Sequence, residues 1–246
     1  MVATNYDPIA EQYQRSKQQA WRTYIECFTL MKLIGDPRGL NVLDVACGEG
    51  FYSRMIRERG AARVTGVDLS PRMIELARKQ EAQHRLGIEY VVGDARELPD
   101  SRQFDLVIAA YLLNYAQDGQ QLQAMYDGLA RSLRPGGRFV TVNSSPALKF
   151  PSAPSYRKYG FETSVRGQWQ EGVPITWTFY LNDGPLEIEN YHLGTTTHET
   201  ICRIAGFREI RWRPVELSPE GLTVQDQAFW STFLDHPPIA FIECAR

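Results

Sequence analysis

Between residues 41 and 143, short apolar runs alternate with segments of helical pattern. The apolar runs are NVLDVA, RVTGVDL, IEYVVGD, FDLVIAAYLL and RFVTVN. Such alternation is typical of a parallel sheet, because parallel strands need crossover connections that helices usually provide. The run FDLVIAAYLL is apolar almost throughout, as expected of a strand covered on both faces. The sequence therefore predicts an α/β protein built on one central sheet.

Turn and cap residues predict where several of these elements begin and end. Ser70 followed by Pro71 predicts a helix start, because serine caps helices and proline suits the first helical position. That helix is expected to run to about Gly87, and Gly60 is placed to cap the preceding one. The sequence RPGG at 134–137 predicts a turn before the last apolar run.

Two further regions flank this alternating core. Residues 6–34 have an irregular apolar face and are expected to be helical, and GDPRG at 35–39 ends them. After Asn143 a Pro- and Ser-rich stretch is followed by PITWTFYL and LEIENYHL, which flank Asn182-Asp183-Gly184 and predict a β-hairpin. We expect a single domain over residues 1–246, with a helical segment at 1–35 and an insertion at 144–195.

Composition narrows the possible partners and location. The net charge of –2 over 246 residues shows no excess of basic residues that would favour binding to nucleic acid. The sequence contains no run of 18 apolar residues, so we expect no membrane span. The N-terminus lacks the features of a secretory signal. The four cysteines form no C-x-x-C pair and no ligand-like spacing with histidine, so we expect free thiols, no metal site and a cytoplasmic protein. The sequence does not indicate an oligomeric state.

The Gly-rich stretch DVACGEGFYS at 44–53 follows the first apolar run and invites three interpretations. A Walker phosphate loop requires a Lys-Ser or Lys-Thr pair, which is absent. A nicotinamide-binding fingerprint requires a third glycine where Ser53 stands. The third interpretation is a ligand with an amino-acid end and an adenosine end.

Acidic residues at three successive strand ends suit this third ligand. Asp44 can accept from an ammonium group, directly or through water, Asp68 can bind a ribose diol, and Asp94 can accept from the amine of adenine beside the Ala95 amide. In an open α/β sheet the carboxyl ends of the strands are where ligands bind. Each acid also has a simpler interpretation: Asp44 as a helix cap, Asp68 as a turn residue and Asp94 as a solvated loop residue.

These segments together resemble the class I S-adenosylmethionine-dependent methyltransferases. The resemblance rests on VLDVACGEG, VTGVDLSPRMIELAR, VVGDARELP, FDLVIAAYLLNYA and LRPGGRFV, with GFREIRW and PIAFIECAR as closing strands. It implies a Rossmann-like seven-stranded sheet of order 3-2-1-4-5-7-6 with the last strand antiparallel. It also implies S-adenosyl-L-methionine as methyl donor. Ala46 departs from the family, which usually has a glycine there.

The resemblance also implies roles for individual residues. Asp68 would bind the ribose, Asp94 and Ala95 the adenine, and Asp44, Ala46 and Gly48 the methionine end of the donor. The backbone carbonyl of Ala110 would face that end as well. Leu69 and Met73 would flank the adenosine.

Candidates for the acceptor pocket lie in three regions. The N-terminal YDPIAEQYQRSK resembles a helical lid, and Tyr13 would sit near the methyl group or, equally, pack the lid to the core. In YLLNYA, Tyr111, Asn114 and Tyr115 would face the donor. The segment lacks the Asn-Pro-Pro-Tyr type of motif found in nucleic-acid amino-methyltransferases. The insertion is rich in aromatic residues, which would wall a flat substrate or pack the hairpin. His192 is the histidine nominated as a general base.

The expected function is methyl transfer to a small aromatic or heterocyclic acceptor on nitrogen or oxygen. Finer features, ACGEGFYSR, AAYLLNYA and GGRFVTVN, resemble N-methyltransferases of toxoflavin-type heterocycles. The long aromatic insertion argues against a lipid-quinone methylase. The alternatives are a nicotinamide-dependent oxidoreductase and a non-catalytic protein that binds S-adenosylmethionine.

Overall fold

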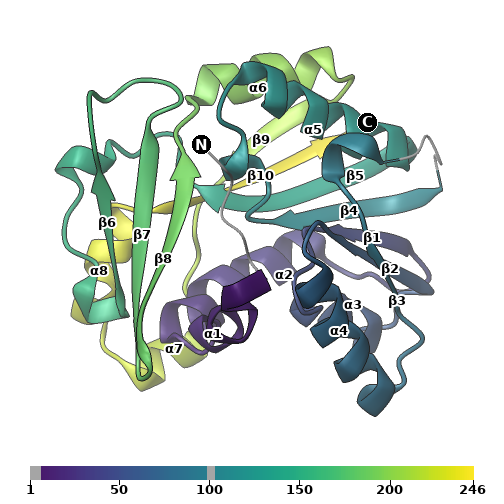
Figure 1. The fold of residues 1–246 in the computed structure, drawn as a ribbon, viewed down its shortest axis with the longest axis horizontal. Helices are drawn as coiled ribbons and strands as arrows, with labels where there is room; N and C mark the ends of the chain where they lie inside the picture. The colour runs from purple at the N-terminus through teal and green to yellow at the C-terminus, as the bar shows by residue number, and fades with distance from the viewer. Residues whose placement is uncertain (1–6, 99–102) are drawn as a thin grey trace.

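Two sheets organise the computed structural model, which describes residues 7–98 and 103–246 (Figure 1). The larger sheet has seven strands in the order β3-β2-β1-β4-β5-β10-β9, and β10 runs antiparallel to both of its neighbours. Its strands are β1 (Asn41–Val45), β2 (Arg63–Asp68), β3 (Glu89–Val92), β4 (Phe104–Ala110), β5 (Leu133–Ser144), β9 (Arg208–Arg213) and β10 (Ile239–Ala245). Since β9 and β10 are the sixth and seventh strands of this sheet in chain order, the predicted order 3-2-1-4-5-7-6 is confirmed.

Helices cover both faces of the seven-stranded sheet, which explains its apolar central strands. In β4, residues 106–109 are at most 1% exposed. One core cluster joins the sheet to α2 (Phe28–Ile34), α3 (Phe51–Glu58) and α4 (Pro71–His84), and a second joins it to α5 (Gly119–Ser132) and α6 (Thr195–Ile204). In Figure 1 these two groups of helices lie below and above the sheet.

Local sequence signals set several boundaries. The Ser70 hydroxyl accepts from the Met73 amide at the start of α4, as the Ser-Pro pair predicts. The helix ends at His84, three residues before Gly87, because Arg85 adopts a left-handed backbone with φ of 53°. Residues 134–137 are not a separate turn: they belong to β5, which is irregular there and has a register shift against β4.

The N-terminal segment is helical, as predicted for residues 6–34, but it is broken into several helices. It contains the short helix η1 (Asp7–Ile9), α1 (Ala10–Ser16) and the π-helical η2 (Arg22–Cys27), followed by α2; residues 1–6 lie outside the described part. Between α1 and η2, the Gln19 side chain bonds the Gly160 carbonyl and the Trp21 indole. This anchor turns Trp21 and Arg22 into the interior. We keep the name lid for residues 7–34.

The insertion forms a second, three-stranded antiparallel sheet (Figure 1). The predicted hairpin is β7 (Pro174–Leu181) with β8 (Gly184–Tyr191), and β6 (Phe161–Val165) adds a strand that the sequence analysis missed. Residues 175, 177 and 179 of β7 are buried in alternation and join the core that contains the lid. Most aromatic residues of the insertion therefore pack the interior, and two of them, Trp177 and Phe179, also line a cavity described below.

The remaining short elements are η3 (Ala95–Glu97), η4 (Leu113–Tyr115), η5 (Phe150–Ser152), η6 (Arg157–Tyr159), α7 (Pro219–Val224) and α8 (Gln227–Asp235). Over the described residues, no helix is long and apolar enough to cross a membrane, and no cluster of three or more His, Cys, Asp or Glu could hold a metal ion.

Candidate active site

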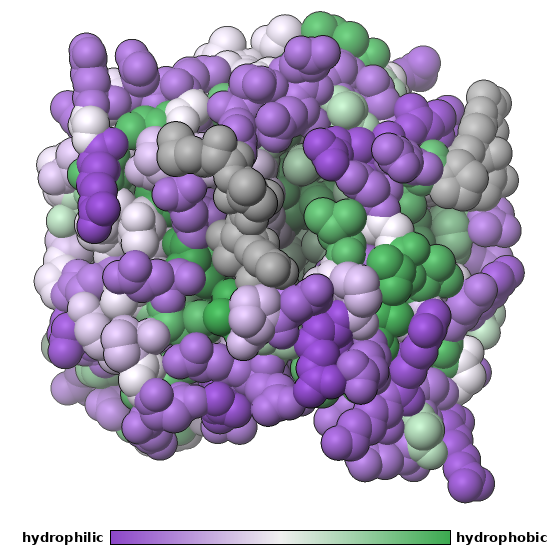
Figure 2. Space-filling model, in the orientation of Figure 1, coloured by the Kyte–Doolittle hydropathy of each residue, from purple (hydrophilic) through white to green (hydrophobic). Residues whose placement is uncertain are grey.

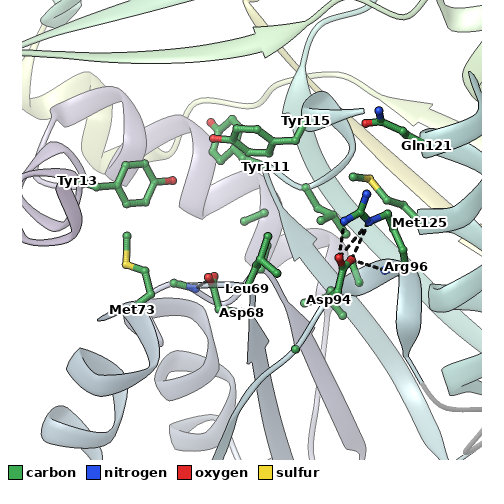
Figure 3. A pocket seen from close by; sticks show the side chains of 17 residues that line it. Tyr13, Asp68, Leu69, Met73, Asp94, Arg96, Tyr111, Tyr115, Gln121 and Met125 are labelled. Carbon is green, nitrogen blue, oxygen red and sulfur yellow. Dashed lines mark hydrogen bonds and ion pairs between the residues drawn. The ribbon is translucent and has the colours of Figure 1, made fainter. Parts of the chain in front are cut away.

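A cavity of about 170 Å³, the main cavity, lies at the carboxyl ends of β1, β2 and β4 (Figure 3). It is lined by Tyr13, Val45, Ala46, Gly48, Asp68, Leu69, Met73, Gly93, Asp94, Ala95, Arg96, Ala110, Tyr111, Leu112, Tyr115, Gln121 and Met125. Every residue predicted to hold the donor is among them except Asp44. The lid contributes Tyr13, so the N-terminal segment closes one side.

The Gly-rich turn and Asp68 hold each other in place. Asp68 accepts from the Gly48 amide at 2.8 Å through one oxygen and from the Ser70 amide at 2.9 Å through the other. Burial raises the pKa of Asp68, while these two amides oppose the rise. Ala46 has φ of 58°, a left-handed value that glycine adopts more readily, so the substitution keeps the loop conformation at a small cost in strain.

The turn leaves room for a ligand to approach its backbone. A Cβ at Gly48 would have Lys17 Nζ at 3.8 Å and Met73 Sδ at 3.9 Å as its nearest neighbours. Lys17 reaches this position from the lid and pairs with the buried Glu49 at 3.4 Å. A positive charge therefore lies over the turn, which the sequence did not reveal because Lys17 and the turn lie far apart in the chain.

Asp94 lies on the opposite side of the main cavity from Tyr13 and is paired with Arg96 (Figure 3). Its carboxylate accepts from the Arg96 backbone amide at 2.9 Å and from Nε at 3.0 Å. This bonding to Arg96 lowers the pKa of Asp94. Asp94 is thus an ionised acceptor at the cavity wall.

Leu69 and the edge strand leave apolar surface near this opening. Figure 2 shows hydrophobic residues on the face over β2 and β3, where Leu69, Val91 and Val92 are exposed. Leu69 is 63% exposed, which is unusual for a leucine beside a cavity. A flat apolar surface such as an adenine ring would cover it.

Asp44 lies beneath the turn and is only 1% exposed. The Ser53 hydroxyl, on α3, donates to it at 2.6 Å. Burial raises the pKa of Asp44 to about 7. The Ser53 backbone amide bonds Asp44 as well. Ser53 is the third residue of α3, which starts after Gly50 without a cap from a Gly50 side chain, so the carboxylate also serves the start of this helix, as the simpler interpretation of Asp44 expects.

A second cavity of about 20 Å³, the side cavity, adjoins the main one. Tyr13, Tyr111 and Tyr115 line both cavities, and the side cavity extends between the lid and β7–β8. Its other lining residues are Trp21, Arg22, Trp177, Phe179, Ile188 and Asn190. Tyr111 has φ of 63°, a strained backbone for an aromatic residue, of the kind that clusters at functional sites.

The lid also supplies a buried charge cluster to this region. Arg22 Nη1 donates to Glu26 at 3.0 Å, and Glu26 accepts in addition from the hydroxyls of Tyr52 and Tyr111. Burial opposes the charge on Arg22, but Glu26 together with the surrounding tyrosines outweighs it, so the pKa of the guanidinium is raised. Tyr111 was expected to face the donor, whereas Arg22 was not among the predicted site residues, since residues so far apart in the chain give no common pattern.

The predicted catalytic residues Asn114 and His192 line neither of these cavities. They share a third, smaller cavity of about 10 Å³ with Asn143, Ser144 and His198. His192 stacks on Trp169 with ring centroids 4.0 Å apart, and burial lowers its pKa. The Asn114 side chain is 3% exposed and has no hydrogen-bond partner among the described residues.

Comparison with known proteins identifies the family to which the chain belongs. A family model described as a methyltransferase domain matches residues 42–137. The ubiquinone/menaquinone biosynthesis C-methyltransferase UbiE of Desulfotalea psychrophila is 33% identical over 226 residues, covering 90% of this chain and 85% of that protein. The chain belongs to the S-adenosylmethionine-dependent methyltransferases.

More distant relatives of this methyltransferase agree in fold or chemistry. The N-demethylindolmycin N-methyltransferase of Streptomyces griseus is 25% identical over 172 residues, covering 69% of this chain and 70% of that one. A crystal structure of an S-adenosylmethionine-dependent methyltransferase from Mesorhizobium loti has a TM-score of 0.65 at 23% identity, covering 94% of this chain and all of that one. The protein is therefore an enzyme that uses S-adenosylmethionine, and the oxidoreductase and non-catalytic alternatives are wrong.

Proposed function

We propose that this methyltransferase transfers a methyl group from S-adenosylmethionine to a small aromatic or heterocyclic acceptor, on nitrogen or oxygen. The observation that carries the proposal is the side cavity, whose aromatic walls open onto the main cavity through three tyrosines. Flat substrates fit aromatic walls, and a few polar groups then fix their orientation. The small-molecule acceptors in the names of both relatives support it.

In this proposal the main cavity holds the donor. Asp68, fixed by two backbone amides, binds the ribose diol, and Asp94 with the Ala95 amide binds the adenine. Ala46, Gly48 and the Ala110 carbonyl contact the methionine end. Leu69 and Met73 flank the adenosine. Asp44 acts from beneath the turn, on the ammonium group through water.

The donor supplies an activated methyl group on a positively charged sulfur. The chain's own task is then to align the acceptor with it and to exclude water, which can be worth about 7–11 kcal/mol. Tyr13, Tyr111 and Tyr115 stand where the two cavities meet and present ring faces that tolerate positive charge. Asn114 and His192 contact neither cavity, so we assign them no step in the transfer.

A second candidate is transfer to carbon on a quinone-like ring. It is favoured by the 33% identity to a ubiquinone/menaquinone C-methyltransferase over most of both chains, which weakens the argument from the aromatic insertion. We also propose a cytoplasmic location, which the free thiols of all four cysteines support, and no nucleic-acid partner.

The donor site is tested by replacing Asp68 with alanine and measuring S-adenosylhomocysteine binding by calorimetry. We expect at least about tenfold weaker binding, because hydrogen bonds to a charged group contribute about 1.5–3 kcal/mol. Asp105→Ala is the matched control: Asp105 also accepts a backbone amide, that of Asn41 at 2.7 Å, but near the start of β4, at the opposite edge of the sheet. Equal affinity in both variants would refute the ribose assignment.

The acceptor is tested with cell extract and isotopically labelled donor. Mass spectrometry should reveal a small molecule that gains one labelled methyl group only when enzyme is present. Nuclear magnetic resonance of that product identifies the methylated atom. A methyl group on carbon would favour the second candidate, and labelling confined to nucleic acid or protein would contradict both.

A further inference from the structure

Two residues that line the side cavity each carry a buried donor group without a partner among the described residues. Arg22 is 5% exposed and Trp177 3%, and neither Arg22 Nε nor the Trp177 indole nitrogen has a hydrogen-bond partner among the described residues. Buried polar groups are paired in the great majority of cases, because an unpaired one keeps the full penalty of desolvation. Two unpaired donors in one small cavity therefore indicate a missing oxygen acceptor.

The charge around Arg22 indicates which kind of oxygen is missing. Its guanidinium is already paired with Glu26, and Glu26 is held by two further hydroxyl donors. Of the described residues that line the side cavity, Arg22 alone carries a charge. A carboxylate or phosphate would place a second negative charge beside Glu26 with no further cation on the wall, whereas a neutral oxygen brings lone pairs without that repulsion.

The dimensions of the side cavity set how such a group enters. A volume of about 20 Å³ holds one water-sized group. Arg22 lies over the ring faces of Tyr111 and Phe179, each with its guanidinium carbon 5.3 Å from the ring centroid. An oxygen atom fits this space, while the ring that bears it stays between Tyr13, Tyr111 and Tyr115, toward the main cavity.

We propose that the side cavity is a specificity site for a neutral carbonyl oxygen on a flat acceptor, and that Arg22 Nε and the Trp177 indole N–H donate to that oxygen. This rests on the proposed function, because the same tyrosines then hold the acceptor ring facing the methyl donor. Arg22 and Trp177 orient the substrate by one end and leave its other end for methylation. An acceptor without a carbonyl group would leave both donors unpaired and would be discriminated against.

The test uses three bicyclic probes with protein saturated by S-adenosylhomocysteine. 4-Quinolone carries a neutral ring carbonyl, quinoline lacks it, and quinoline-4-carboxylate carries a charged group. Calorimetry should show 4-quinolone binding about tenfold or more tighter than either of the others, since two hydrogen bonds distinguish it. Equal binding of 4-quinolone and quinoline would mean that water fills the cavity, and would overturn the proposal, as would tighter binding of the carboxylate.

Variants then assign the two donors separately. Trp177→Phe keeps an aromatic ring but removes the N–H, and Arg22→Lys keeps the charge but removes Nε; each should reduce the preference for 4-quinolone about three- to tenfold. Trp212→Phe is the control. Trp212 lies in β9 and lines neither cavity, and its indole N–H donates to Glu199 of α6. The preference for 4-quinolone should therefore be unchanged in this variant. A preference that survives either Trp177→Phe or Arg22→Lys refutes the two-donor site.

Two outcomes separate this inference from the proposed function. If S-adenosylhomocysteine itself does not bind the parent protein, the donor site is wrong and the proposed function fails. If it binds but 4-quinolone does not, the carbonyl specificity fails while the donor site stands. Circular dichroism of each variant confirms its fold before binding is compared.

Discussion

The acidic residues Asp44 and Asp68 show how much of a site can be predicted from acids at strand ends. Asp68 is the last residue of β2 and lines the main cavity, as predicted. Asp44 is one residue from the end of β1, and its side chain faces Ser53 under the turn. The sequence places both acids near the same edge of the sheet, but only the packing of α3 decides which carboxylate reaches the cavity.

Replacing Asp44 with asparagine should change how stability depends on pH. The pKa of Asp44 is about 7 in the folded protein, against an ordinary value of 3.8. Between these pH values the unfolded chain has lost this proton while the folded protein keeps it, so the free energy of unfolding falls as pH rises from about 4 to 7. Asp44→Asn removes this term. Relative to the parent, the variant should gain up to about 4 kcal/mol between pH 4 and pH 8.

Urea unfolding at several pH values measures this difference. Ser53→Ala provides the matched comparison, because the Ser53 hydroxyl lowers the pKa of Asp44 and its loss should extend the fall in stability above pH 7. Parallel pH profiles for the parent and Asp44→Asn would show that Asp44 titrates normally.

At the scale of elements, the sequence predicts what local signals determine. The parallel pairing of β1 to β5, the start of α4 and the β7–β8 hairpin were predicted from alternation, a cap and a turn, and all three are confirmed. The strand order was implied by the family resemblance and is also confirmed. The break in the lid and the strand β6 depend on contacts between distant segments, such as Gln19 with Gly160. Residues 17–19 therefore look helical in sequence although they form a turn.

Gly128 in α5 is required by close packing on the adenine side of the main cavity. A Cβ there would lie 2.0 Å from the backbone oxygen of Ala95, which lines the cavity. Gly128→Ala should thus destabilise the protein by about 1–3 kcal/mol, despite the roughly 1 kcal/mol by which alanine favours a helix. We also expect weaker S-adenosylhomocysteine binding, because Ala95 must move.

Gly119→Ala tests the same change at the start of the same helix. Its Cβ would meet Ile201 Cδ1 at 3.4 Å, an ordinary contact, so the free energy of unfolding should change by less than about 0.5 kcal/mol. Thermal unfolding and calorimetry of both variants measure the effects. A Gly128→Ala protein as stable as Gly119→Ala would contradict the close contact with Ala95.

At the scale of the molecule, the lid connects the two sheets across both cavities. Arg15 pairs with Asp183 and Gln12 bonds Gly184, both at the β7–β8 turn, while Lys17 pairs with Glu49 beside the Gly-rich turn. The main cavity's acids and glycines were predictable because each lies in a contiguous motif. The side cavity was not, because the lid, residues 111–115 and β7–β8 meet only in the folded chain.

Lys17 should couple closure of the lid to binding of the donor. Its ammonium group lies over Gly48, where we place the methionine end of the donor. That end carries a carboxylate, which a cation attracts, so Lys17→Met should weaken S-adenosylhomocysteine binding about tenfold. Arg15→Met, in the same lid, removes an exposed ion pair of the kind that contributes little, and should change affinity less than about twofold. Calorimetry measures both, and similar affinities for the two variants would exclude a direct role for Lys17.

The aromatic interior of the insertion is continuous with the lid and the C-terminal region. Trp21 of the lid packs against Phe161 of β6 and Phe233 of α8, and Phe161 stacks on Trp177. A graft of the hairpin alone from a relative would replace one wall of this shared interior and leave its partners mismatched. In such an architecture, a preference for a new acceptor would arise more easily by single substitutions of residues that line the side cavity than by exchange of whole segments.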